Sequence, residues 1–255
     1  MIPSIPLITP PSVWRDLQKK VAKILTGCGF ETAVEKRIDT VRGSVVIDVH
    51  AEKAGSNQGK VLCECKHWNR RVTKIMVHAF RTVLGDSGSS QGIIISKNGF
   101  QKGAYEAARY ANLCLYSWAE FVAAFTLDYL QYTIDRNHKK GYELRMLVND
   151  IIQLSDHHPF LMSPVEVEGF QAIRNGHADY LFYSFREHYE DIQTMTITRD
   201  EVERGIKVAT RDLNIAPESI DEFFDYIYER CRKAVEQVED LLKKLGNKVM
   251  EKEAS

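Results

Sequence analysis

The sequence predicts an α/β sandwich built on a central mixed sheet, followed by an all-helical C-terminal region. Between residues 12 and 125, short runs rich in β-branched residues alternate with segments whose apolar residues recur at helical spacing. Two of the runs are joined by a polar loop so short that their strands should be antiparallel. After about Phe125 the strand pattern stops and only helical patterns follow.

The first element is a helix that starts near residue 12. Pro10 and Pro11 close an extended leader, Ser12 is a candidate cap, and Gly27 and Gly29 end the helix. The apolar positions that recur at helical spacing are Val13, Trp14, Leu17, Val21, Ile24 and Leu25. This stripe predicts a helix that buries one face.

Five strands and two more helices complete the predicted domain. The β-branched content of the runs predicts strands rather than short helices. In chain order the strands are Phe30–Ile38, Val45–Ala51, Val61–Trp68, the run GIIIS and the run LCLYSW, with helices near Thr73–Leu84 and Gln101–Tyr110. The polar loop Glu52–Lys60, with Gly55 and Gly59, joins the second strand to the third.

The C-terminal region, residues 126–255, carries a long apolar seam. Its members are spaced alternately by four and three residues and are Ile220, Phe224, Ile227, Cys231, Ala234, Val238, Leu241 and Leu245. Such spacing is typical of a coiled coil or a helical hairpin. The helix therefore packs against its own domain or forms a dimer contact, and the region is a candidate for dimerisation or for recognition of DNA or a partner protein.

Composition favours a soluble cytoplasmic protein and excludes few functions. The chain has 255 residues, 44% of them hydrophobic and 27% charged, with a net charge of −1. A neutral total can still contain a local basic cleft, so nucleic-acid binding is not excluded. The N-terminus lacks the basic region of a signal peptide, and no apolar run approaches the ~20 residues that a membrane helix needs. The 5 cysteines show no zinc or redox spacing.

Charged residues interrupt two of the apolar strands. Alternation along the third strand places Glu64 and Lys66 on one face and Cys63 and Cys65 on the other. Asp48 interrupts the preceding strand in the same way. Burying unpaired charges costs free energy, so charges retained at such positions indicate a functional site. An antiparallel pairing of the right register would bring Asp48 to within ~5 Å of Glu64 between Cβ atoms.

Two neighbouring carboxylates repel each other and favour a cation between them. Hard oxygen ligands with open positions suit Mg²⁺, with Mn²⁺ as a substitute, and predict Asp48 and Glu64 as metal ligands. Lys66 would lie ~7 Å from Glu64 along the strand and could orient the attacking water or stabilise the charged phosphate. The chemistry predicted for Asp48, Glu64 and Lys66 is metal-assisted hydrolysis of a phosphodiester.

The pattern resembles the PD-(D/E)xK nuclease superfamily, and within it the Mrr-type restriction endonucleases. The segments that carry the resemblance are GFETAVEKRI, IDVHAE, VLCECKHWNRRV, HAFRTVLGDSG, GIIISKNGFQKGA and LYSW. The resemblance implies that Asp48, Glu64 and Lys66 are the metal-binding and catalytic residues. It also implies a central four-stranded mixed sheet, DNA cleavage, often a homodimer, and a setting in prokaryotic restriction or antiviral defence.

One position departs from the family pattern. Where the family commonly has a glutamate in the first helix, this chain has Gln18. Either the amide substitutes there, or Glu35 on the first strand supplies the extra carboxylate. Five further residues follow the ends of strands and are candidate contacts to DNA: Arg70, Arg71, Lys74, Lys97 and Gln101.

Two other functions are also compatible with the sequence. Gln18 favours a catalytically weak or partner-activated module that binds DNA and acts as a sensor, whereas the intact Asp48, Glu64 and Lys66 argue against it. The same metal chemistry would also serve an RNA-directed nuclease. The target sequence, any effect of methylation and any activator are not encoded in a recognisable motif.

Overall fold

A computed structural model describes residues 5–53, 59–158, 161–191, 194 and 196–253, with side chains described up to residue 250. Gly55 of the predicted loop and residues 1–4 of the leader lie outside these residues. The chain divides into two compact units, residues 7–132 and residues 1–6 with 133–255. Helix α4 (Trp118–His157) contributes to both, and each unit has its own hydrophobic core.

The first unit is built on one mixed sheet with the strand order β1-β2-β3-β4-β5. The strands are β1 (Glu31–Thr40), β2 (Gly43–Glu52), β3 (Val61–Lys66), β4 (Gln91–Ser96) and β5 (Leu113–Ser117). Strands β1, β2 and β3 pair antiparallel, whereas β3, β4 and β5 pair parallel. The mixed sheet confirms the predicted fold class. It has five strands instead of the four that the resemblance implied, because β1 pairs with β2 from Glu31 to Thr40 and extends the sheet at its edge.

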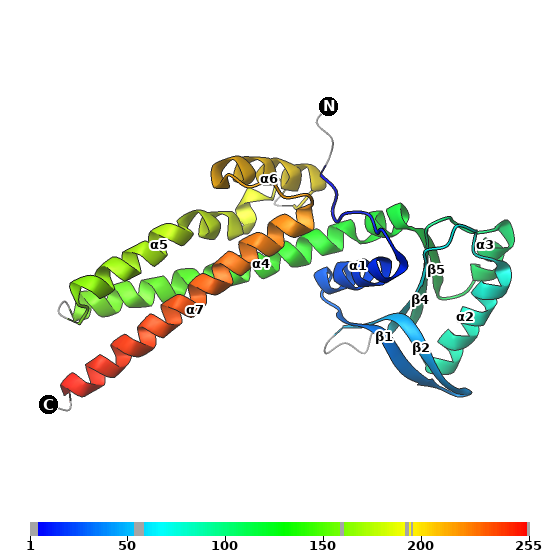
Figure 1. The fold of residues 1–255 in the computed structure, drawn as a ribbon, viewed down its shortest axis with the longest axis horizontal. Coiled ribbons are helices and arrows are strands. Elements are labelled where there is room, and N and C mark those ends of the chain that lie inside the picture. Colours follow the sequence, from blue (N-terminus) through cyan, green and yellow to red (C-terminus); the bar gives the residue numbers. More distant parts are fainter. Residues whose placement is uncertain (1–4, 54–58, 159–160, 192–193, 195, 254–255) are drawn as a thin grey trace. The chain divides into compact units, whose positions relative to one another are not determined.

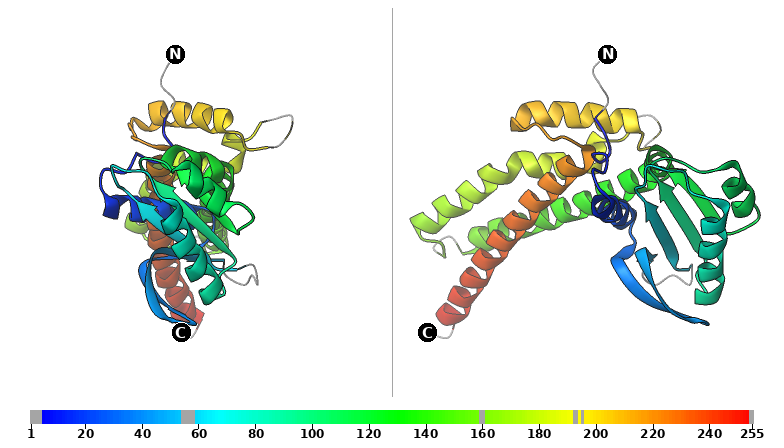
Figure 2. Two further views of the ribbon diagram at one scale, coloured as in Figure 1. Left: turned by 90° about the vertical axis from the view of Figure 1, so that its right-hand side faces the viewer. Right: turned by 45° about the vertical axis from the view of Figure 1, so that its right-hand side comes forward.

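Helices cover both faces of this sheet. Helix α1 (Trp14–Gly27) lies on one face, and α2 (Lys74–Ser87) and α3 (Lys102–Ala108) lie on the other (Figures 1 and 2). Four members of the predicted stripe are buried, namely Leu17, Val21, Ile24 and Leu25, whereas the first two, Val13 and Trp14, are exposed. Ser12 is not the helix cap: Val13 occupies that position, and Ser12 donates to the carboxylate of Asp16 from both its backbone N–H and its hydroxyl. Asp16 lies in the first turn, where a carboxylate is favourable.

The beginning of α4 packs against the end of α1. A Cβ atom on Gly27 would lie 2.1 Å from a ring carbon of Tyr129, which is closer than atoms can approach. Gly27 is therefore needed for this close contact as well as for the end of the helix. The ring of Phe121, earlier in α4, is fully buried and packs on Phe125 with ring centroids 4.9 Å apart.

The second unit is helical in its described residues. It contains the rest of α4, α5 (Pro164–Ser184), the short 3₁₀ helix η1 (Arg186–His188), α6 (Arg199–Leu213) and α7 (Ile220–Glu253). Helices α5 and α7 pack side by side (Figure 1). In the described part of the chain, no helix is long and apolar enough to cross a membrane.

The apolar seam of α7 forms part of this unit's own core. Seven of its eight members are fully buried, and Leu241 is partly buried. Ala234, Val238 and Leu245 pack in one cluster with Leu144 of α4 and Phe170 of α5. Of the two expectations for this seam, packing within its own domain is therefore the one that the structure supports.

Candidate active site

Strands β2 and β3 separate at Asp48. Their ladder runs from the pair Ala51–Val61 to the pair Val49–Cys63. Beyond it, the backbone N–H of Cys65 donates to Oδ2 of Asp48 at 2.6 Å, so a side chain takes the place of a backbone acceptor. This bond fixes the carboxylate of Asp48 against the strand that carries Glu64.

Gln18 holds the other oxygen of this carboxylate. Its Nε2 donates to Oδ1 of Asp48 at 2.8 Å, and the residue is 1% exposed. Gln18 lies on the face of α1 that packs on the sheet, which brings it to β2. The structure thus places the amide beside Asp48, where the family pattern has a glutamate.

Glu64 and Lys66 form an ion pair on the face of the sheet that α2 covers. Nζ of Lys66 donates to Oε1 of Glu64, and the two side chains are 14% and 24% exposed, respectively. Both line a cavity of ≈ 280 Å³ whose other walls come from β2, α2, β4 and the residues before α2. These walls are apolar and consist of Val45, Val46, Ile47, Val72, Ile75, Met76, Ala79, Phe80, Val83 and Ile94.

The surroundings of Glu64 disfavour its negative charge. Burial raises the pKa of the Glu64 carboxyl, and the nearby charge of Asp48 raises it further, while Lys66 acts in the opposite direction. The fold therefore places the carboxylates of Asp48 and Glu64 close enough to repel each other. A cation placed between them would relieve this repulsion.

Two tryptophans that the sequence reasoning did not select as functional contact the same strand. Trp14 of α1 donates from its indole Nε1 to the carbonyl oxygen of Cys65 at 3.0 Å. Two cations lie over the ring of Trp68: Nζ of Lys66 is 4.9 Å from the ring centroid, and the guanidinium carbon of Arg70 is also 4.9 Å from it. An aromatic ring two residues after Lys66 was the available signal, because it can hold cations on its faces.

Glu35 lies across the β1–β2 hairpin from Asp48. The pairs Val34–Val49 and Lys36–Ile47 flank it on both sides. Its backbone is left-handed, with φ of 52°, and its side chain is exposed. This conformation is unusual for a glutamate in a strand. Register thus brings Glu35 next to Asp48, although no hydrogen bond or ion pair joins it to another described residue.

The predicted DNA contacts gather where β3 and β4 end. The backbone N–H of Lys97 donates to the carbonyl of Lys66 at 2.9 Å, and that of Gln101 donates to the carbonyl of Val72 at 3.0 Å. These bonds join the segment after β4 to the segment after β3. All five candidate side chains are exposed: Arg70, Arg71, Lys74, Lys97 and Gln101.

The donor set fits a hard divalent cation bound largely by water and substrate. Within the described residues, no group of three or more His, Cys, Asp and Glu side chains is placed to hold a metal ion. Mg²⁺ needs fewer protein ligands, because it keeps several waters and takes one or two carboxylates. Each oxygen of Asp48 accepts one hydrogen bond here and retains a second lone pair.

A family match covers the part of the chain that contains this site. Residues 12–125 match the family model Mrr_cat, described as a restriction endonuclease. This part of the chain is therefore similar to the catalytic domain of Mrr-type restriction endonucleases. The comparison with curated proteins gave no match. A crystal structure described as a protein of unknown function, AF1548, is 17% identical over 90% of this chain and 97% of that chain, with a TM-score of 0.36.

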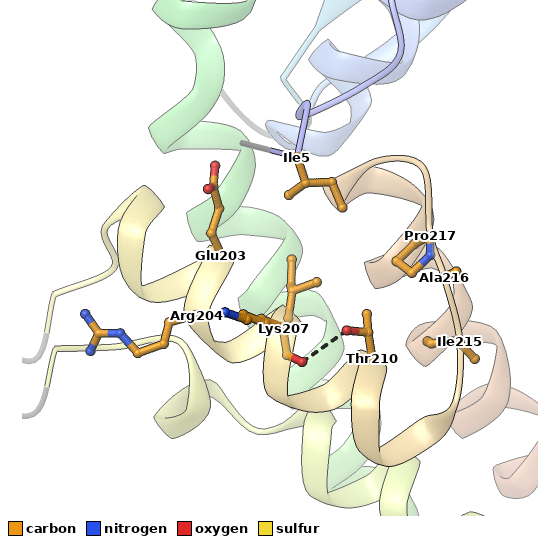
Figure 3. A pocket seen from close by; sticks show the side chains of 9 residues that line it. Ile5, Glu203, Arg204, Lys207, Thr210, Ile215, Ala216 and Pro217 are labelled. Carbon is orange, nitrogen blue, oxygen red and sulfur yellow. Dashed lines mark hydrogen bonds between the residues drawn. The ribbon is translucent and has the colours of Figure 1, made fainter. Parts of the chain in front are cut away.

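A larger cavity of ≈ 560 Å³ lies in the helical unit, outside the restriction endonuclease domain. It is lined by Ile5, Glu203, Arg204, Ile206, Lys207, Thr210, Ile215, Ala216 and Pro217 (Figure 3). The hydroxyl of Thr210 donates to the carbonyl of Lys207 at 3.1 Å. The guanidinium of Arg204 points away from the other residues of the lining. None of the predicted site residues lines this cavity.

Proposed function

We propose that the nuclease domain hydrolyses DNA phosphodiester bonds with the help of a divalent cation, Mg²⁺ with Mn²⁺ as a substitute, held by Asp48 and Glu64. One observation carries the proposal: the two carboxylates lie close together where β2 and β3 separate, with Lys66 paired to one of them. The family supports a nuclease activity, and this arrangement supports the roles of the three residues.

Each residue of the site has a separate role in this proposal. A bound divalent cation supplies a Lewis acid and lowers the pKa of its bound water. Asp48 is held ready by Gln18 and by the Cys65 N–H. Lys66 can orient the attacking water and stabilise the negative charge that develops on the phosphate. The ring of Trp68 limits the positions open to the Lys66 ammonium group.

Substrate binding is assigned to the exposed groups at the ends of β3 and β4. Arg70, Arg71 and Lys74 would contact phosphates on one side of the site, and Lys97 and Gln101 on the other. Glu35 is a further candidate for the active site, because register brings it beside Asp48.

The broader setting is also part of the proposal. We place the protein in the cytoplasm, in prokaryotic restriction or antiviral defence. Cutting both strands of a duplex requires two active sites, which favours a homodimer. The buried seam of α7 already packs within its own unit, so such a dimer would use another surface. The helical unit is a candidate for dimerisation or for recognition of DNA or a partner protein.

Cleavage of supercoiled plasmid DNA in Mg²⁺, Mn²⁺ or EDTA tests the proposal, with single-stranded RNA as a parallel substrate. We expect nicked or linear DNA with either metal and intact plasmid in EDTA. Digestion of RNA but not DNA would replace the proposal with the RNA-directed nuclease. DNA binding without cleavage in any metal would favour the sensor or partner-activated module.

A further inference from the structure

A second pocket lies on the sheet face that carries Glu64, next to the C-terminal end of α2. Its volume is ≈ 280 Å³. It is lined by Lys36, Arg37, Ile38, Asp39, His50, Lys60, Leu62, Ser87 and Ser89. None of its polar residues belongs to the proposed active site or to the proposed DNA contacts.

Register fixes the position of this pocket relative to the active site. His50 of β2 pairs with Leu62 of β3, so both point to the same face. Leu62 and Glu64 are two residues apart on β3, so they share that face at a spacing of ~7 Å. The pocket and Glu64 are therefore neighbours along one strand.

Cations dominate the pocket. Nζ of Lys36 lies 3.4 Å from Nδ1 of His50, which must be the acceptor because an ammonium group can only donate. Among the described residues, Lys36 and Lys60 form no ion pair within 4.0 Å. Asp39 is the single acid in the lining. The positive charges thus face one another without a matching number of carboxylates.

His50 is buried in this pocket beside the two lysines, with only 4% of its surface exposed. An anion in the pocket would offset the repulsion among these groups. The hydroxyls of Ser87 and Ser89, 2.8 Å apart, add hydrogen-bonding groups that suit a phosphate oxygen.

We propose that this pocket binds a phosphate of the nucleic-acid chain that the domain cleaves, at a position other than the scissile one. Lys36 and Lys60 neutralise the phosphate, and His50 and the two serine hydroxyls surround it. This inference rests on the proposed nuclease function. It gives the substrate a second point of attachment on the face that holds Glu64 and Lys66.

Cations beside the carbonyl end of a helix can also stabilise the helix itself. Lys36 and Lys60 lie near that end of α2, through Ser87 and Ser89. The two roles differ in what they change. If the lysines stabilise the helix, removing them lowers the melting temperature of the protein. If they bind a phosphate, removing them lowers the affinity for DNA and makes that affinity less dependent on salt.

The test is equilibrium binding of duplex DNA in EDTA, where no cleavage occurs, over a series of NaCl concentrations. The variant Lys36→Ala/Lys60→Ala is compared with wild type and with Lys19→Ala/Lys23→Ala, which removes the same charge from α1. Each lost phosphate contact lowers the slope of log Kobs against log[salt] by ~0.9. Because the two lysines neutralise one phosphate, we expect the pocket variant to lose a slope of ~0.9, with an affinity roughly tenfold lower, for every duplex sequence alike.

Three results would overturn the proposal. One is a pocket variant that binds DNA no more weakly than the Lys19→Ala/Lys23→Ala control. Another is a lower melting temperature with unchanged DNA affinity, which would assign the lysines to the end of α2. A third is competition by inorganic phosphate that depends on the lysines while DNA affinity does not. If wild type cleaves DNA and the pocket variant binds it normally, only this inference fails; if wild type binds no nucleic acid, the proposed function fails as well.

Discussion

Strand β3 and the seam on one face of helix α7 both bury apolar residues, but charged residues take positions among those of the first only. In β3, Glu64 stands between two buried cysteines, Lys66 follows the second of them, and both charged residues lie at the candidate active site. In α7, the seam from Ile220 to Leu245 is uninterrupted and forms a core. Uninterrupted apolar spacing therefore indicates packing, whereas charges that break an apolar strand indicate a site, because burying them is costly without a function.

The largest effect should come from Glu64→Gln. Removing one of the two carboxylates proposed to bind the metal should lower the cleavage rate by at least about 10³-fold, since metal catalysis is worth several kcal/mol. Rates at saturating Mg²⁺ would be compared with those of Glu106→Gln, an exposed glutamate on α3. Cleavage within about threefold of wild type would contradict the assignment of Glu64 as a ligand.

Although Glu64→Gln should lower the cleavage rate, it should raise the stability of the metal-free protein. The pKa of Glu64 is raised above its usual 4.5, so its charged form is less favourable in the folded protein than in the unfolded chain. For this group, metal-free stability increases as the pH falls from above the raised pKa toward 4.5. Glu64→Gln should therefore melt at a higher temperature than wild type at neutral pH in EDTA. The difference should narrow as the pH falls through the raised pKa, and the opposite trend would contradict the burial of this charge.

Leu245→Ala tests whether the buried seam of α7 serves packing within its own unit. Removing a fully buried leucine from a core typically costs about 2–5 kcal/mol of stability. We expect a loss of this size in denaturant unfolding of the helical unit, with the cleavage rate per folded molecule unchanged. Lys244→Ala, exposed on the same helix, should change stability by less than about 0.5 kcal/mol. A change in oligomeric state without loss of stability would instead make the seam a dimer contact.

A smaller effect is expected for Gln18→Ala. Gln18 donates a hydrogen bond to Asp48, a proposed metal ligand, and losing such a partner typically costs 10–100-fold in metal affinity or activity. The Mg²⁺ concentration for half-maximal cleavage should rise more than the maximal rate falls. Gln18→Glu, which restores an oxygen at this position, is the informative second variant. Equal effects of Gln18→Ala and Lys19→Ala would show that the bond to Asp48 is unimportant.

The smallest effect should come from Arg71→Ala. One lost phosphate contact should reduce the salt slope of DNA binding by ~0.9 and weaken binding equally for all sequences. Arg15→Ala, an exposed arginine on α1, is the matched control. An unchanged salt slope would remove Arg71 from the proposed DNA-binding surface.

The sequence predicted most of the fold because its local patterns agree with the tertiary structure. Alternation along β3 was sufficient to place Glu64 and Lys66 on one face, away from Cys63 and Cys65. The hairpin geometry was sufficient to bring Asp48 near Glu64. In both cases the relevant neighbours lie within one or two strands.

The features that the sequence could not predict depend on distant elements. The bond from Gln18 to Asp48 requires α1 to cross β2, and the bond from the Cys65 N–H requires β2 and β3 to separate at that residue. The left-handed backbone of Glu35 has no local signal, because glutamate rarely adopts it. The basic pocket assembles residues of β1, β2 and β3, the residue before β3, the last residue of α2 and a residue that follows it, and these are scattered along the sequence.

The most direct test of the central claim is cleavage of supercoiled plasmid in Mg²⁺ by wild type, Lys66→Ala and Lys19→Ala under identical conditions. We predict nicking or linearisation by wild type and Lys19→Ala, and no detectable product from a Lys66→Ala protein with an unchanged melting temperature. Undiminished cleavage by Lys66→Ala would place the active site elsewhere in the molecule.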